Sequence, residues 1–165
     1  MLSMIINLKN ISEKNIKNLL INGDKIVRNI NRISKNTKNI IKLNGATYAK
    51  LNIDIKSYGS IFNFLNQNYK MNEYYTDEFI KYFIKFMFVN FNDVYYVVYG
   101  NISDPIDIKE SKLMLTGMYL NKLYLTLTGH VFIEEPDFDM KVILTYTDNK
   151  LLIDKFDNWG INLID

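Results

Sequence analysis

The strongest pattern along the chain is an alternation of apolar and polar residues within residues 113–154. Leu123, Leu125 and Leu127 alternate with Tyr and Thr residues, and this period of two is typical of a β-strand with one buried face. Turn residues divide the region into two expected hairpins, one about Asn121-Lys122 and one joined at Asp148-Asn149. We therefore expect an antiparallel sheet at the C-terminal end of the chain.

Upstream, the spacing of apolar residues changes to three and four, which predicts helix over residues 12–43. Gly23 and Asp24 interrupt this run, so we expect Gly23 to close a first short helix and Asp24 to cap a second that starts near Lys25. Asn44-Gly45 would then end the second helix. The N-terminal part is thus predicted to consist of two helices.

The middle of the chain combines both patterns. Ser60 and Thr76 are suitable N-caps for two helices, because their side-chain oxygens can accept a hydrogen bond from a free backbone N–H of the first turn. The expected elements are a strand over 47–56, helices over 61–68 and 76–90, a strand over 93–99 and an exposed loop over 101–111.

These elements predict an α+β fold: N-terminal basic helices, one early strand, two further helices, then a C-terminal, mostly antiparallel sheet of about five strands. We divide the chain into a basic helical segment, 1–45, and an α+β domain, 46–165. The element order is similar to that of cone-shaped domains of the nuclear-transport-factor type. That similarity implies a helical layer over a curved sheet.

Charge is distributed unevenly along the sequence. Residues 1–50 contain ten Lys and Arg against two acidic residues, a net charge of +8, whereas the rest of the chain carries ten basic and sixteen acidic residues, a net charge of −6. Six cations of the predicted second helix recur at spacings of three and four and form a stripe: Lys25, Arg28, Arg32, Lys35, Lys38 and Lys42. Such a stripe is suited to a polyanion.

Three partners fit this stripe. RNA or DNA would bind through its phosphates, by position rather than by sequence. An anionic membrane surface is less favoured, because the apolar side of the predicted helix is almost entirely Ile and Leu. An acidic protein surface is the third, and the acidic sheet half of another copy would serve. The opposing interpretation is that A+T-rich coding places Lys on any solvated helix face.

Composition supports a folded domain and excludes several chemistries. The 165 residues are 48% apolar, which is enough for a substantial core, and the chain has no Cys and therefore no disulfide or thiolate site. The 22 Asn, 23 Ile and 18 Lys against 2 Ala indicate an A+T-rich genome, as in organelles, large DNA viruses or phages. No secretion signal or membrane-spanning run is visible.

Candidate catalytic chemistry is sparse. His130, the only histidine, lies close in sequence to Glu134, Glu135, Asp137 and Asp139, so it is a candidate general base, although a solvated histidine is the simpler interpretation. No phosphate-binding glycine loop is present, and we expect no cofactor or metal.

Aromatic residues offer a second candidate surface. Tyr95, Tyr96, Tyr99 and Phe91 would stack on bases if they faced outward, but more often form core. We expect Trp159 to pack back onto the core. Neither feature by itself defines a function.

The sequence therefore predicts a non-catalytic structural subunit of a larger assembly. Its basic helix would contact nucleic acid, RNA being favoured in an organellar ribosome-like particle, and its acidic sheet half would contact protein neighbours. The alternatives are a small-ligand-binding or minor enzymatic cone-shaped domain, and a viral or phage structural or host-interaction protein. The predicted localisation stays open between an organellar (mitochondrial) matrix and a viral or cytoplasmic setting.

Overall fold

The computed structural model describes residues 11–102, 105–156, 158 and 161–163. It is an α+β fold in which strands outnumber helices. Its described helices are α1 (Glu13–Asn31), α2 (Ile61–Tyr69) and α3 (Asp77–Met87), with short 3-10 turns at Ile55–Tyr58 and Met71–Glu73. Its described strands are β1 (Lys35–Leu43), β2 (Ala46–Leu51), β3 (Phe88–Phe91), β4 (Val94–Val98), β5 (Gly100–Ile102), β6 (Lys112–Tyr119), β7 (Lys122–Gly129), β8 (Phe138–Thr147), β9 (Lys150–Lys155) and β10 (Ile161–Leu163).

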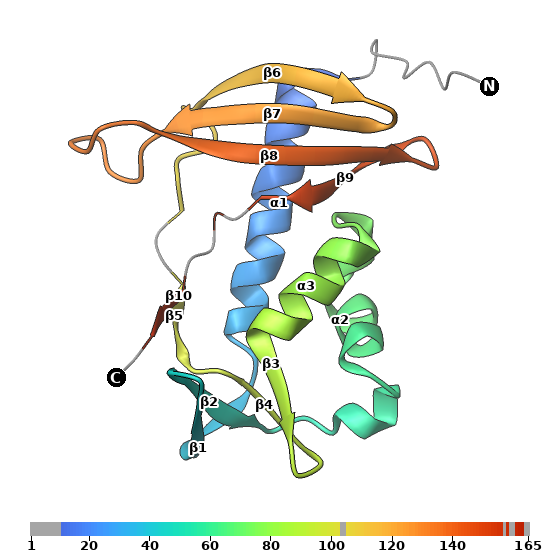
Figure 1. Ribbon diagram of the computed structural model, residues 1–165, viewed down its shortest axis with the longest axis vertical. Helices are drawn as coiled ribbons and strands as arrows, with labels where there is room; N and C mark the ends of the chain where they lie inside the picture. The colour runs from blue at the N-terminus through green and yellow to red at the C-terminus, as the bar shows by residue number, and fades with distance from the viewer. Residues whose placement is uncertain (1–10, 103–104, 157, 159–160, 164–165) are drawn as a thin grey trace.

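The strands form two separate four-stranded antiparallel sheets and one two-stranded pair. The first sheet has the order β1-β2-β4-β3, the second β6-β7-β8-β9, and β5 pairs with β10. The prediction of a single C-terminal sheet of about five strands is therefore wrong in detail. β4 pairs with β2 and β3 in the first sheet, whereas β6 to β9 form the second sheet by themselves (Figure 1).

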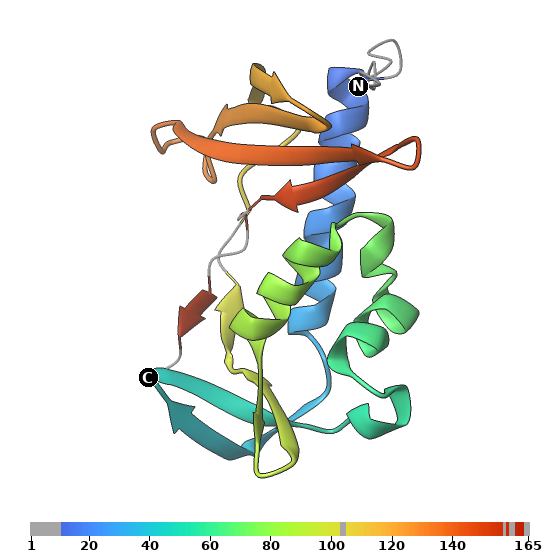
Figure 2. The same ribbon diagram turned by 45° about the vertical axis from the view of Figure 1, so that its right-hand side comes forward.

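Helix α1 connects the two sheets. In both views it runs from beside the β6-β7-β8-β9 sheet toward the first sheet, while α2 and α3 lie beside its C-terminal half (Figures 1 and 2). Its buried residues Leu20, Val27 and Ile30 belong to one continuous apolar core that also contains Val97 of the first sheet and Leu144 of the second. A single core therefore extends along this helix.

The prediction of two N-terminal helices is wrong. α1 continues without a break through Gly23 and Asp24, and the following segment, Lys35–Leu43, is strand β1. Asn44 and Gly45 have positive φ angles of 51° and 80°, and they form the tight turn of a β1–β2 hairpin rather than a helix end. The division of the chain after residue 45 stays a prediction.

Other local predictions are confirmed. The side chains of Ser60 and Thr76 accept hydrogen bonds from the N–H groups of Asn63 and Phe79, and they cap α2 and α3. A cap of this kind contributes about 1 kcal/mol. Both C-terminal hairpins form, as β6–β7 and β8–β9.

Several expectations change at the ends of elements. The strand expected over 47–56 ends at Leu51, and the loop expected over 101–111 begins within β5. The expected packing of Trp159 concerns a residue outside the described part of the chain. In the part of the chain that the structure describes, no helix combines the length and the hydropathy that a membrane-spanning helix requires.

Gly23 allows α1 to pack closely against its neighbours. A Cβ atom at this position would lie 2.6 Å from Ile153 Cδ1 and 2.9 Å from the Tyr75 hydroxyl oxygen. Tyr75 also pairs with Ile153 through an isolated β-bridge, so both contacts belong to the junction between α1 and the second sheet. Gly23 therefore serves as a site of close approach, not as a helix end.

We expect Gly23→Ala to lower the free energy of unfolding by up to about 2 kcal/mol, because the gain in helix propensity of about 1 kcal/mol offsets only part of an overpacking cost of about 1–3 kcal/mol. Urea unfolding measures the change. Gly117→Ala is the matched control, since no atom lies within 4 Å of a Cβ at that position. A Gly23→Ala variant as stable as the wild type would contradict this account of the helix junction.

Candidate protein-binding site

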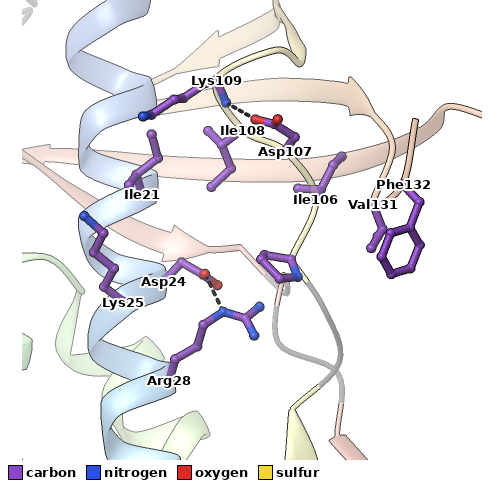
Figure 3. A pocket seen from close by; sticks show the side chains of 11 residues that line it. Ile21, Asp24, Lys25, Arg28, Ile106, Asp107, Ile108, Lys109, Val131 and Phe132 are labelled. Atoms are coloured by element: carbon purple, nitrogen blue, oxygen red, sulfur yellow. Dashed lines mark hydrogen bonds and ion pairs between the residues drawn. The ribbon is translucent and has the colours of Figure 1, made fainter.

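An open groove with a volume of about 550 Å³ lies between α1 and two connecting segments. α1 contributes Ile21, Asp24, Lys25 and Arg28, and the other lining residues come from the segment 105–109 and from Val131 and Phe132 after β7 (Figure 3). Residues more than 100 positions apart in the sequence thus line one site. Its lining combines aliphatic side chains with charged groups of both signs.

The floor of the groove is tied together by an ion pair. Arg28 Nε donates to Asp24 Oδ2 at 2.6 Å, and Arg28 Nη2 donates to the backbone oxygen of Asn158 at 2.8 Å. Asn158 Oδ1 in turn accepts the backbone N–H of Ile106 at 3.0 Å. The arginine therefore joins α1 to the C-terminal segment, and that segment holds the loop that forms the opposite wall.

The Asp24 side chain is buried beside the groove, and its exposed fraction is 6%. Desolvation raises the pKa of this carboxyl group, and the hydrogen bond and charge of Arg28 oppose that rise only in part. Burial, and then the charge of Asp24, raise the pKa of the Tyr75 hydroxyl well above its ordinary value. Asp24 Oδ1 and the Tyr75 hydroxyl have no hydrogen-bond partner among the described residues.

The loop between β7 and β8, residues 130–137, borders the same groove. His130 Nδ1 lies 2.8 Å from Asp137 Oδ1 across the base of the loop, and the backbone N–H of Glu135 donates to the oxygen of Phe132 at 2.9 Å within it. The backbone oxygen of His130 accepts the N–H of Asp107 at 3.0 Å, which connects the loop to the groove wall. The loop is therefore braced at several points.

The sequence analysis did not predict that the apolar residues of this loop are exposed to solvent. Ile133 is 90% exposed and Phe132 is 54% exposed, although both are large and apolar. The available signal was the triplet Val-Phe-Ile directly before the turn-forming residues Glu-Glu-Pro-Asp. An exposed apolar group at a braced loop tip is typical of a protein contact.

The six predicted nucleic-acid-binding cations do not share one helix face. Lys25 and Arg28 lie at the groove and Arg32 follows the last residue of α1, whereas Lys35, Lys38 and Lys42 lie on β1. Lys35 Nζ donates to the backbone oxygen of Asn31 at 2.6 Å, and burial lowers its pKa. The single stripe was inferred from a helix over 25–43, whereas α1 ends at Asn31 and residues 35–43 form β1.

The candidate general base and the candidate aromatic residues lie outside the groove. His130 is partly exposed and pairs with Asp137, but it does not line the groove. Among the described residues, no group of three or more His, Asp or Glu side chains is arranged to hold a metal ion. Tyr96 is buried in the core, as its strand position favoured, while Phe91 is 42% exposed.

We expect Asp24→Asn to change the pH dependence of stability. Because the native carboxyl pKa is raised, the native state holds this proton more tightly than the unfolded chain, so ionisation of Asp24 costs stability as the pH rises above 3.8. Relative to the wild type, the variant should therefore gain unfolding free energy between about pH 3 and pH 7.

Urea unfolding across this pH range measures the difference, with Asp148→Asn, at an exposed turn, as the control for loss of one carboxylate. A difference between Asp24→Asn and the wild type that stays flat or falls with pH would show that Asp24 is not a costly buried charge.

Comparison with known protein families gives one informative match. Residues 7–158 match the family described as IseA DL-endopeptidase inhibitor. A comparison with curated proteins gives no match. The family match overturns the prediction of an RNA-binding structural subunit of a ribosome-like particle, and it does not support the alternatives of a small-ligand cone, a minor enzyme or a viral structural protein.

Proposed function

Because the chain belongs to the IseA DL-endopeptidase inhibitor family, we propose that it binds a DL-endopeptidase and stops this enzyme from cleaving its substrate. The observation that carries the proposal is the extent of the match. Residues 7–158 include α1 to α3, both four-stranded sheets and the entire groove. The match therefore includes the elements that build the candidate site, and it favours a protein as the partner.

We assign the principal contact to the β7–β8 loop. Ile133 and Phe132 would leave water when a partner covers them, and burial of one such side chain contributes about 1.5–3 kcal/mol. The His130–Asp137 contact and the backbone hydrogen bonds hold the loop in one conformation before binding. Less conformational entropy is then lost on association, which favours tight binding.

Acidic residues flank this apolar tip. Glu134, Glu135 and Asp137 are exposed on the same loop, so a basic rim on the enzyme would complement it. Through this loop, the acidic sheet half would contact a protein, as the charge distribution of the sequence predicts. The charges would chiefly raise the association rate and select the partner, while the apolar tip supplies binding energy.

The proposal is tested by titrating a purified DL-endopeptidase with the protein and following cleavage of a peptide that contains the scissile D–L bond. We expect the rate to fall as the protein is added, and to approach zero once inhibitor exceeds enzyme. An endopeptidase that cleaves only between L-residues is the control for general interference. An unchanged cleavage rate at a large excess of protein would refute the proposed function.

Ile133→Asp should weaken inhibition by about tenfold or more, because it replaces an apolar contact with a desolvated charge at the centre of the proposed interface. Leu120→Asp is the matched control: Leu120 is 77% exposed and lies in the β6–β7 turn at the opposite end of the same sheet. The inhibition constant of each variant is compared with that of the wild type. Equal losses for both variants, or none for Ile133→Asp, would remove the loop from the interface.

A further inference from the structure

The segment 105–111 lies directly beside the β7–β8 loop and forms the groove wall opposite α1. Ile106 and Ile108 are buried in the core, whereas Asp107 and Glu110 are exposed. Residues 105–111 and 130–137 together carry five carboxylates and one lysine. The exposed side of the segment therefore continues the acidic flank of the loop to which we assign the principal contact.

Two adjacent backbone N–H groups hold this segment from opposite sides. The N–H of Asp107 donates to the oxygen of His130 at 3.0 Å, and the N–H of Ile106 donates to Asn158 Oδ1 at 3.0 Å. The second bond is buried, so water cannot replace it when it is lost. The isoleucine contacts cannot substitute for it, because burial of apolar surface has no preferred direction.

A further bond to the segment is weaker. Lys17 Nζ donates to the backbone oxygen of Lys109 at 3.1 Å, but this bond is exposed and competes with water. Asn158, whose exposed fraction is 4%, is therefore the main directional anchor of the segment on the side away from the β7–β8 loop.

Arg28 fixes Asn158 in turn. Its Nη2 donates to the backbone oxygen of Asn158 at 2.8 Å, while its Nε donates to Asp24 Oδ2 at 2.6 Å (Figure 3). The two bonds use separate nitrogens of one planar guanidinium, so they define both a distance and an angle. Phe156, which is 1% exposed, anchors the same C-terminal segment in the core. A chain of contacts thus runs from α1 through Arg28 and Asn158 to Ile106.

We propose that Arg28 and Asn158 are positioning residues for inhibition: they hold the segment 105–111 in the conformation that meets the peptidase beside the β7–β8 loop. The proposal rests on the proposed function, which supplies the partner. Asn158 is buried and two Arg28 nitrogens are directed at protein oxygens, so both residues suit support rather than contact. A segment held in place before binding loses less conformational entropy on association.

Two variants of unchanged net charge test the two links. In Arg28→Lys the single ammonium nitrogen cannot make both bonds in the same geometry, and in Asn158→Leu the acceptor for Ile106 is lost. We expect each variant to raise the inhibition constant against a DL-endopeptidase by about tenfold. Amide hydrogen exchange of Ile106 in the free protein should become faster in both. Unchanged exchange of Ile106 in both variants would overturn the proposal.

Val97→Ala is the control for a general loss of stability. Val97 is fully buried in β4 of the first sheet, so its truncation lowers the free energy of unfolding without touching the groove wall. The inhibition constant of this variant should stay within about twofold of the wild type. Losses of inhibition that simply follow the loss of unfolding free energy across the three variants would show that Arg28 and Asn158 act through stability alone.

The double variant Arg28→Lys/Asn158→Leu tests whether the two residues act in one chain of contacts. Because Arg28 reaches the segment through Asn158, the double variant should inhibit about as well as the weaker of the single variants. A loss equal to the product of the two single losses would mean that the residues act independently, and it would contradict the proposed chain.

The same assays separate this inference from the proposed function. If the wild type inhibits a DL-endopeptidase and both single variants inhibit it equally well, the positioning role fails while the proposed function stands. If the wild type does not inhibit, the proposed function fails, and the positioning role fails with it.

Discussion

The close contact of α1 with Tyr75 and Ile153 at Gly23 is the constraint on which the rest of the fold depends. Each of the two sheets has one face to bury, and neither packs on the other as in a sandwich (Figure 2). Their apolar faces meet one continuous core that follows α1. A helix held further away would open this core, and it would also displace the wall of the groove that Ile21 and Asp24 provide.

The ion pair between buried Asp24 and partly exposed Arg28 shows how the same helix positions the site. Desolvation of Asp24 costs free energy and offsets much of the stabilisation that the ion pair provides. The pair therefore acts chiefly by fixing the orientation of the Arg28 side chain. Arg28 reaches Asn158, and Asn158 holds Ile106, so the helix, the C-terminal segment and the groove wall are fixed relative to one another. A binding surface built on such a network needs little rearrangement to meet a partner.

Local signals were sufficient to predict the elements whose ends depend on neighbouring residues. Capping at Ser60 and Thr76 and the turn at Asp148-Asn149 depend on neighbouring residues, and these predictions are confirmed. The helix over 25–43 failed because isoleucines in β1 fall by chance at helical spacing, while Asn44-Gly45 closes a hairpin. The groove was not predictable, since long-range pairing brings its walls together, and the charge asymmetry indicated a charged partner without identifying its class.

The central claim is that a peptidase binds across the groove and the β7–β8 loop. The most direct test is amide hydrogen exchange of the protein with and without bound DL-endopeptidase. The account predicts slower exchange in residues 105–111 and 130–138 on binding, with little change in the β1–β2 hairpin. Protection confined to the β3–β4 hairpin or to β1, with 105–111 and 130–138 unchanged, would contradict it.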